Sequence, residues 1–392
     1  MQFRWATPGT GRRSAPSPAA DRFMTGAAAT ASLPAQLESG LRESQLAGLD
    51  GIRALAAFLV VFYHAGIPLV SGGAGVLMFF VLSGFLITWL LLRENDELGA
   101  VSLRKFYMRR SLRIFPAFYC YAAVLFGIYL IRHTRIVWPQ ALAALFYVGN
   151  YYQALNGDPN TGFSHTWSLA IEEQFYVLWP ITFLLLRRDY RRMCQFLAGA
   201  ILAIWVYREA LVFIFDVHEG YIYEAFDTRA DHLLIGCLLA VMLRARLFPQ
   251  FWGWISVRSW AAAVVAALLA MSSVAECVYG HVYRDSVSFI ANPLLTAVWI
   301  TQLIALRSAP LWRWTNWEWV RYLGRISYSI YLYQQLMVDV PKKLLAHQPV
   351  VVQLAATIAL IVAVASVSHF FVERPFLRLK ARFKQTAAGA AL

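Results

Sequence analysis

Charged residues are scarce in this chain, and its few cysteines follow no recognisable pattern. Only 15% of the 392 residues are charged, against about 25% in a typical soluble domain, while 59% are hydrophobic. The four cysteines (Cys120, Cys194, Cys237 and Cys277) lack C-x-x-C or zinc-ligand spacing and lie in or beside apolar runs. These deficits exclude a soluble enzyme, a disordered chain and a disulfide scaffold. We expect no metal site, and no fixed-period repeat or second soluble domain is visible.

Long apolar runs fill the chain from residue 54 to residue 372. Such runs approach the ~20 residues that a helix needs to cross a bilayer. Eleven candidate spans cover 54–70, 74–92, 115–131, 137–155, 169–186, 195–215, 230–243, 260–275, 286–306, 326–341 and 350–372. The sequence therefore predicts an all-α polytopic membrane protein.

The Lys and Arg residues decide how many of these segments cross. If all eleven crossed from a cytosolic N-terminus, the basic clusters at 187–192 and 307–325 would lie outside, against the positive-inside rule. If 137–155 enters and returns, or lies at the interface, most Lys and Arg become cytosolic. We therefore predict about ten transmembrane helices, one re-entrant or interfacial segment and two cytosolic termini. The formal charge of +13 then reflects topology in the bilayer, with no nucleic-acid partner.

The remaining segments flank this membrane domain, which we place at 46–376. Residues 1–45 are rich in Ala, Ser, Pro and Gly and are predicted to be a disordered cytosolic tail. Residues 377–392 form a basic cytosolic tail. The composition favours a bacterial inner (plasma) membrane, and it leaves a homo-oligomer open.

Ionisable residues inside apolar spans are costly, so each is a functional candidate. His64 lies about ten residues into the first span, which predicts a position near the bilayer midplane. A neutral imidazole there suits a general base or a proton relay. The alternative is a structural histidine bonded to a helix carbonyl, and position alone does not separate the two.

Two carboxylates open the span at 169–186. Glu172 and Tyr176 are four residues apart and share a helix face, and Glu173 adjoins them. A carboxylate in the first turn could orient an imidazole or receive its proton. A helix cap by Ser168 explains one carboxylate but not two.

Two further polar groups fall in later spans. Arg208 and Glu209 are best explained by an internal ion pair or by snorkelling. The stretch 227–232 (Asp-Thr-Arg-Ala-Asp-His) places four ionisable groups at the outer mouth of the next span. We interpret it as a polar site facing the bundle interior, with a solvated loop end as the alternative.

The cytosolic segment 104–113 carries five positive charges in ten residues. On a helix Arg113 neighbours both Arg109 and Arg110, so these side chains could hold phosphate groups. Lipid phosphates could be the only anions bound. In the second span Ser83-Gly84 interrupts large apolar residues, which favours close helix packing, with a tunnel lining as the second interpretation.

Taken together, the motifs resemble those of the acyltransferase-3 family of integral-membrane acyltransferases. The blocks that carry the resemblance, in chain order, are residues 49–57 with His64 (LDGIRALAA, then H), 78–87 (MFFVLSGFLI), 109–116 (RRSLRIFP), 166–176 (TWSLAIEEQFY), 227–231 (DTRAD), 323–332 (LGRISYSIYL) and 372–376 (VERPF). The resemblance implies about ten transmembrane helices and transfer of an acyl group, often acetyl, from acyl-coenzyme A to hydroxyls of carbohydrates, lipids or natural products. Acyl-coenzyme A would be a donor substrate, and no bound cofactor is implied.

The resemblance also assigns roles to individual residues. His64 is similar to the family's essential histidine, as general base or transient acyl carrier, and Arg53 to its partner at the cytosolic end. Arg109, Arg110 and Arg113, with Ser83, would bind the donor. Glu172 would orient the imidazolium of His64. Trp167, Ser168, Tyr176, Arg229 and Asp231 would shape or support the acceptor site.

The sequence departs from the family pattern at two points, and two other functions are compatible with it. Tyr333-Gln334 stands where members often have Trp-His, so no role is carried over for that second histidine. The chain ends sixteen residues after Phe376, so a soluble hydrolase-like domain is not expected. The main alternative function is a proton-coupled transporter or flippase that uses His64 as a relay, although the repeats common in such folds are not visible. A non-catalytic scaffold is the third.

Overall fold

The computed structural model describes residues 33–43, 46, 48–307, 309–380 and 383, and this part of the chain is helical without a strand. The first half contains α1 (Ala35–Leu41), α2 (Gly48–His64), α3 (Gly72–Leu98), α4 (Leu103–Ile131), α5 (Trp138–Leu145), α6 (Gly149–Asn156), η1 (Ser164–Thr166), α7 (Trp167–Leu186) and α8 (Tyr190–Phe213). The second half contains α9 (Glu219–Glu224), α10 (Phe226–Arg244), α11 (Pro249–Val257), α12 (Ser259–Tyr283), η2 (Arg284–Ser288), α13 (Phe289–Leu306), η3 (Pro310–Asn316), α14 (Glu318–Arg325), α15 (Ser327–Met337), α16 (Asp339–Leu344), α17 (Val350–Ser368), η4 (His369–Glu373) and α18 (Arg374–Lys380).

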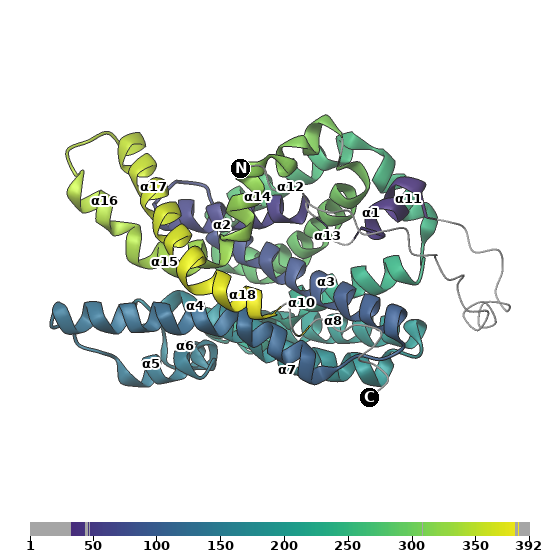
Figure 1. The fold of residues 1–392 in the computed structure, drawn as a ribbon, viewed down its shortest axis with the longest axis horizontal. Helices are drawn as coiled ribbons and strands as arrows, with labels where there is room; N and C mark the ends of the chain where they lie inside the picture. Colours follow the sequence, from purple (N-terminus) through teal and green to yellow (C-terminus); the bar gives the residue numbers. More distant parts are fainter. Residues whose placement is uncertain (1–32, 44–45, 47, 308, 381–382, 384–392) are drawn as a thin grey trace, which may run out of the picture.

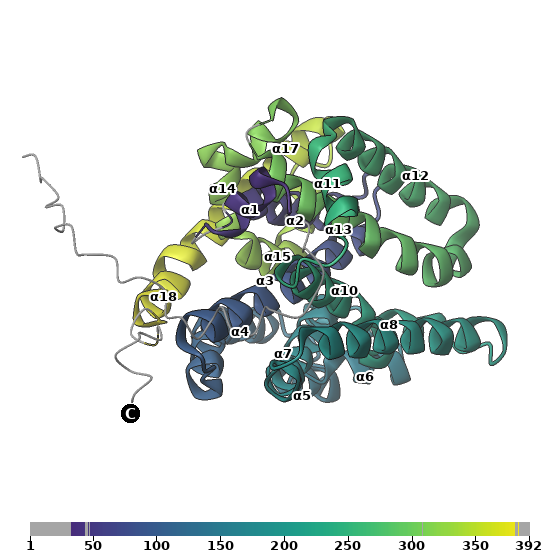
Figure 2. The ribbon, with the colours of Figure 1, turned by 90° about the vertical axis from the view of Figure 1, so that its right-hand side faces the viewer.

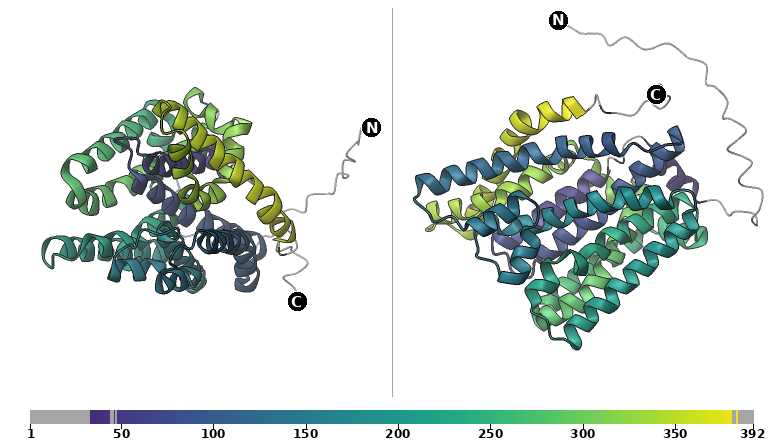
Figure 3. Two further views of the ribbon diagram at one scale, coloured as in Figure 1. Left: turned by 90° about the vertical axis from the view of Figure 1, so that its left-hand side faces the viewer. Right: turned by 90° about the horizontal axis from the view of Figure 1, so that it is seen from below.

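The helices form two groups with α3 and α10 between them (Figures 1 and 2). One group contains α4 to α8, and the other contains α1, α2 and α11 to α17. Figure 3 shows the same division from the opposite side. Near the C-terminus, α18 leaves the second group and packs on α4. Consequently α3 is covered on several sides by other helices, which places its side chains in the protein interior.

Glycines allow α3 and α10 to pack at backbone distance. A Cβ atom at Gly84 would collide with the backbone carbonyl of Leu233, and one at Gly236 would collide with the backbone of Val81 and Phe85. Small residues at such crossings permit this approach in membrane helices. The expected packing role of the Ser83-Gly84 pair is therefore found at Gly84.

Six helical stretches in the described chain are long and apolar enough to cross a membrane. They are Gly72–Leu98, Leu103–Ile131, Ser164–Leu186, Tyr190–Phe213, Ser259–Leu306 and Val350–Leu379. A seventh is obtained if Glu219–Arg244 and Pro249–Val257, bent by 104°, count as one span. The predicted class, an all-α multi-pass membrane protein, is confirmed, whereas length and apolarity alone do not give the predicted count of about ten.

Local breaks explain the difference in count. α2 has only 17 residues and ends at His64. The predicted span 326–341 is divided between α15 and α16 and is preceded by the separate short helix α14. Conversely, the predicted spans 260–275 and 286–306 lie in one helical stretch of 48 residues, which is kinked at Gly280 (φ 68°).

Two other predictions concern segments outside the long helices. The segment 137–155 forms two short helices, α5 and α6, which pack on each other after a turn at Tyr147 (φ 55°), as expected for a segment that does not cross. The predicted disordered tail is too long by about ten residues, because α1 packs on α13 and buries Leu37 completely. Residues 1–32, and most of the predicted tail at 377–392, lie outside the described residues.

Candidate active site

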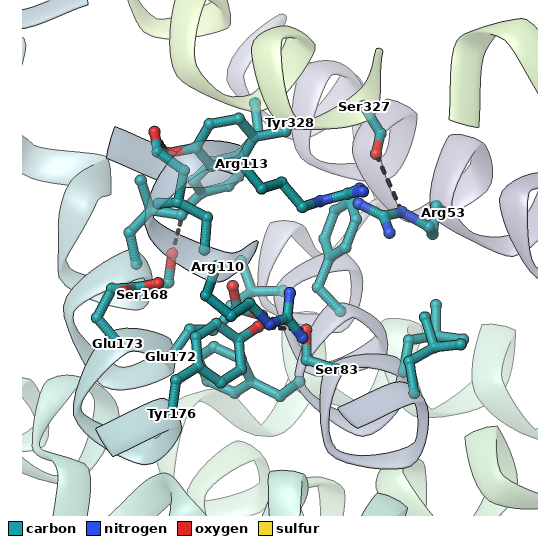
Figure 4. A pocket seen from close by; sticks show the side chains of 18 residues that line it. Arg53, Ser83, Arg110, Arg113, Ser168, Glu172, Glu173, Tyr176, Ser327 and Tyr328 are labelled. Carbon is teal, nitrogen blue, oxygen red and sulfur yellow. Dashed lines mark hydrogen bonds between the residues drawn. The ribbon is translucent and has the colours of Figure 1, made fainter. Parts of the chain in front are cut away.

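A cavity of about 780 Å³ lies where α2, α3, α4, α7 and α15 meet. Its polar lining comes from residues far apart in the sequence (Figure 4). These residues are Arg53, Ser83, Arg110, Arg113, Ser168, Glu172, Glu173, Tyr176, Ser327, Tyr328 and Tyr331. We call this space the arginine cavity.

Three guanidinium groups converge on the arginine cavity. Those of Arg53 and Arg113 point toward each other across it (Figure 4), although both are positively charged. Arg53 Nε donates only a long hydrogen bond, 3.4 Å, to Ser327 Oγ. Arg113 has no hydrogen bond or ion pair with another described residue. Arginine donors left in this state suit an anion that can bind between them.

The third guanidinium belongs to Arg110 of α4, and a tyrosine of α7 holds it in place. It lies over the ring of Tyr176 at 4.3 Å. The Tyr176 hydroxyl donates to Ser83 Oγ at 3.1 Å, and Ser83 Oγ donates to Glu172 Oε1 at 2.6 Å. This chain of contacts holds Glu172 in the arginine cavity, so the Ser83 side chain serves the site while its neighbour Gly84 serves packing.

Arg109 does not join this cluster, which corrects its predicted role in donor binding. Its Nη2 forms an ion pair with Glu94 at 2.7 Å, and its Nη1 donates to the carbonyl of Phe383 at 3.1 Å. Arg110 and Arg113 share the helix face that turns toward the cavity, and Arg109 is rotated by about 100° from Arg110. Helical spacing allowed Arg113 to pair with either Arg109 or Arg110. The packing of α4 turns Arg110 and Arg113 into the cavity together.

A second cavity surrounds His64, which we call the His64 cavity. It has about 1530 Å³ of space that includes open solvent, and its lining includes Asp158, His165, Trp167, Tyr223, Glu224, Glu276 and Arg284. His64 is the last residue of α2, at a helix end rather than within a longer span as predicted, because the chain turns at Gly66 (φ 82°). The predicted place within a continuous helical span is therefore wrong, and the position near the bilayer midplane stays a prediction.

One nitrogen of His64 is already committed. Nδ1 lies 2.9 Å from the carbonyl oxygen of Val60, and a carbonyl only accepts hydrogen bonds, so Nδ1 carries the proton. The lone pair is therefore on Nε2, the nitrogen left for chemistry. Lys342 Nζ donates to the backbone carbonyl of His64 at 3.0 Å and fixes the helix end.

The two cavities are neighbours that share Val76 and Tyr331 in their linings. The Tyr331 hydroxyl lies 2.5 Å from Ser168 Oγ and donates to the carbonyl of His165 at 2.7 Å. Along α2, Arg53 and His64 are eleven residues apart, or roughly 16 Å at the helical rise. The arginine cavity therefore lies beside the N-terminal half of α2 and the imidazole of His64 at its C-terminal end, with Tyr331 lining both cavities.

Glu172 and His64 line different cavities, so the expected contact between them is not formed. The helix face shared by Glu172 and Tyr176 turns toward Ser83 and Arg110 instead. The neighbours Trp167 and Ser168 also separate, with Trp167 in the His64 cavity and Ser168 in the arginine cavity.

Arg229 and Asp231 line neither cavity, so they do not form an acceptor mouth as predicted. Both are completely buried. Arg229 lies among aromatic rings, 3.8 Å from the centre of Phe289 and 5.0 Å from that of Tyr223. Asp231 forms an ion pair with Arg208 at 2.9 Å, which confirms the structural interpretation of Arg208 as one half of an internal ion pair. This buried placement allows Arg229 and Asp231 to support the surrounding helices but not to line the acceptor site.

His165 and Tyr331 were missed as site residues. Tyr331 lies within the motif block 323–332, and His165 directly precedes the block 166–176. His165 is also an ionisable residue at the start of an apolar span. The cost of burying such a group was the signal that could have identified it.

Comparisons with known proteins identify the family of this chain. A family model described as an acyltransferase domain matches residues 46–369. A putative peptidoglycan O-acetyltransferase of Bacillus subtilis (strain 168) is 30% identical over 355 residues, 84% of this chain and 54% of its own length. The peptidoglycan O-acetyltransferase OatA of Listeria monocytogenes is 29% identical over 356 residues, 83% of this chain and 55% of its own. A putative O-acetyltransferase of Staphylococcus aureus (strain COL) is 30% identical over 352 residues, 84% of this chain and 57% of its own.

The chain thus spans about half the length of the curated relatives that it matches. No solved structure matches it. The match to the family model covers both cavities, from Arg53 and His64 on α2 to Tyr331 on α15, and it favours an enzyme over a transporter. On this match the chain belongs to the acyltransferase-3 family of integral-membrane acyltransferases.

Proposed function

We propose that this protein transfers an acyl group, typically acetyl, from acyl-coenzyme A to a hydroxyl group of a cell-envelope glycan. The donor binds in the arginine cavity from the cytosol, and the acceptor reaches the His64 cavity. The observation that carries the proposal is the convergence of three arginines on a cavity that adjoins the one holding an imidazole with a free Nε2.

Phosphate groups of the donor account for the arginines. Arg53 and Arg113 face each other, and neither forms an ion pair with a carboxylate of the described residues, although Asp50 lies close enough for its charge to act on both. A phosphate between the two guanidinium groups would lower their remaining repulsion. A guanidinium offers paired donors that match phosphate oxygens. The apolar lining from α3, including Phe79, Phe80 and Leu86, then suits the uncharged arm that leads to the thioester.

His64 performs the chemistry by one of two balanced routes. In the direct route Nε2 takes the proton of the acceptor hydroxyl while its oxygen attacks the thioester carbonyl, the carbon–sulfur bond breaks, and the thiolate receives that proton. In the two-step route Nε2 itself attacks the thioester carbonyl, the carbon–sulfur bond breaks, and coenzyme A leaves as its thiolate, so that His64 carries the acyl group on Nε2 and keeps its proton on Nδ1. The acceptor oxygen then attacks the acyl carbon, the bond to Nε2 breaks, and the hydroxyl proton passes to a base, while the thiolate takes up a proton from solvent. Both routes use the same nitrogen.

The names of the relatives guide the choice of acceptor. Two of them are named as peptidoglycan O-acetyltransferases, one putatively. The His64 cavity combines carboxylates such as Glu224 and Glu276 with the rings of Trp167 and Tyr223, and this mixture suits a polyhydroxylated sugar. The proposal places the protein in the inner membrane with both termini in the cytosol.

The test measures donor binding and donor cleavage by the purified, detergent-solubilised chain. Calorimetric titration with acetyl-coenzyme A gives the Kd, and thiol release gives cleavage. A charge-assisted hydrogen bond contributes about 1.5–3 kcal/mol, so Arg113→Ala should weaken donor binding roughly 10- to 100-fold. Arg104→Ala removes an exposed arginine of the same helix outside the cavity and serves as the matched control.

His64→Ala should separate binding from chemistry. We expect donor affinity within a few-fold of the wild-type value and thiol release reduced by roughly 10²- to 10⁴-fold. Failure of the folded wild-type chain to bind acetyl-coenzyme A would refute the proposal. Equal loss of affinity in Arg104→Ala and Arg113→Ala would refute the assignment of the donor to this cavity.

A further inference from the structure

Besides the exposed His281, whose Nδ1 lies 3.7 Å from Glu219 Oε2, His165 is a second imidazole that lines the His64 cavity. It belongs to η1, the short helix that leads into α7, and it retains only 5% of its exposed surface. The Tyr331 hydroxyl donates a hydrogen bond to the backbone carbonyl of His165 at 2.7 Å. Gln153 Nε2 donates to the backbone carbonyl of the preceding residue, Ser164, at 3.0 Å. The ring stands edge-on to Tyr121, with the ring centres 5.6 Å apart. The position of this side chain is therefore fixed on both sides.

The hydrogen-bonding capacity of the His165 ring is unfilled within the described residues. Neither ring nitrogen has a partner at hydrogen-bond geometry. The nearby backbone groups are the carbonyls of Gly162 and Leu332, and that of Gly162 already accepts the Tyr121 hydroxyl at 2.6 Å. A neutral imidazole has one donor and one acceptor nitrogen, and carbonyls can serve only the donor. The acceptor nitrogen needs an N–H or O–H group from outside.

We propose that His165 receives the acceptor hydroxyl and takes its proton. This inference rests on the proposed function and adds to it the residue that activates the acceptor. His64 and His165 line one cavity and lie close enough for their charges to interact. His165 is also next to Tyr331, which borders the arginine cavity, so it lies on the side from which the acyl group arrives.

Two imidazoles allow the two-step route to proceed without reusing one group for two tasks. After His64 Nε2 has displaced coenzyme A as its thiolate, it carries the acyl group, and Nδ1 keeps the proton it shares with the Val60 carbonyl, so the ring has no lone pair available as a base. His165 then accepts the hydroxyl proton, the acceptor oxygen attacks the acyl carbon, and the bond from that carbon to His64 Nε2 breaks. The products are the ester, neutral His64 and a protonated His165, which returns its proton to solvent in the cavity.

The test separates the two half-reactions. Envelope vesicles from cells that express each variant supply the natural acceptor, and labelled acetyl-coenzyme A supplies the acyl group. Alkali-labile label in the envelope reports ester formation, and a rapid-mixing experiment on the purified chain reports the first stoichiometric release of thiol. For His165→Phe, which keeps a ring and removes both nitrogens, we expect the first thiol release within about threefold of wild type. Ester formation should fall by roughly 10²- to 10⁴-fold, the range for a lost general base.

His165→Asn and His133→Phe complete the set. Asparagine retains hydrogen bonding without basicity, so ester formation should stay low even if the variant folds better than His165→Phe. His133 is exposed in the loop after α4, and His133→Phe should behave as wild type. Ester formation by His165→Phe within threefold of wild type would overturn the inference, as would a parallel loss of thiol release. A folded wild-type chain that binds acetyl-coenzyme A but releases no thiol without acceptor would also overturn this inference, because it would leave only the direct route of the proposed function. A wild-type chain that does not bind acetyl-coenzyme A would instead refute the proposed function itself.

Discussion

Replacing Asp231 with asparagine should lower the stability of this protein without changing a residue that lines the arginine cavity. Asp231 Oδ2 lies 2.9 Å from Arg208 Nη1 and accepts Trp205 Nε1 at 2.9 Å. Both members of the ion pair are completely buried. Asp231→Asn therefore leaves a guanidinium without a counter-charge in the interior of the helix bundle.

The magnitude follows from that burial. Breaking a buried ion pair by removing one partner costs about 3–5 kcal/mol, because the remaining charge keeps its desolvation penalty. For a chain of 392 residues this corresponds to a drop in Tm on the order of 4–6 °C. Thermal unfolding in detergent, followed by tryptophan fluorescence, measures the drop.

A double variant separates the buried charge from other effects of the substitution. Arg208→Met combined with Asp231→Leu removes both charges and keeps apolar volume, and such replacements are often neutral or stabilising. We expect the double variant to recover at least half of the lost Tm. A double variant as unstable as Asp231→Asn would refute the reasoning. A folded Asp231→Asn chain whose KM is raised only for the acceptor would instead support the predicted role of Asp231 in the acceptor site.

Three further predictions concern packing, hydrogen bonding and topology. Gly84→Ala should lower the yield of folded protein and cost at least about 1–3 kcal/mol, because its Cβ meets the backbone of the neighbouring helix, and detergent unfolding measures the loss. Thr88→Val should cost about 1–3 kcal/mol, since the buried Nε1 of Trp179 donates to the Thr88 hydroxyl at 2.8 Å, and Thr88→Ser should restore most of it. Cys277 is exposed and lines the His64 cavity, so a membrane-impermeant maleimide should label it from outside in spheroplasts but not in Cys277→Ser, and labelling only in inverted vesicles would contradict the topology.

The candidate site could be predicted from the sequence only in part. Helical spacing indicated that Arg113 has neighbours at both Arg109 and Arg110, but the choice between them depends on which way α4 faces, and the ion pair of Arg109 with Glu94 decides it. Likewise, the shared face of Glu172 and Tyr176 was predictable. That this face meets Ser83 rather than His64 depends on where α3 and α7 cross.

The sequence by itself determined the class of this protein. Its apolar runs and scarcity of charge require a helical bundle in a bilayer, because only helices satisfy their own backbone hydrogen bonds there. Its motif blocks determined the family and drew attention to Arg53 and His64. Tertiary structure decided where those residues lie relative to each other. It divided them between two cavities, buried Asp231 with Arg208, and placed His165 in the cavity that His64 lines. The physical reason is that sequence periodicity fixes which side chains share a face of one helix, whereas the contacts between helices fix which faces meet.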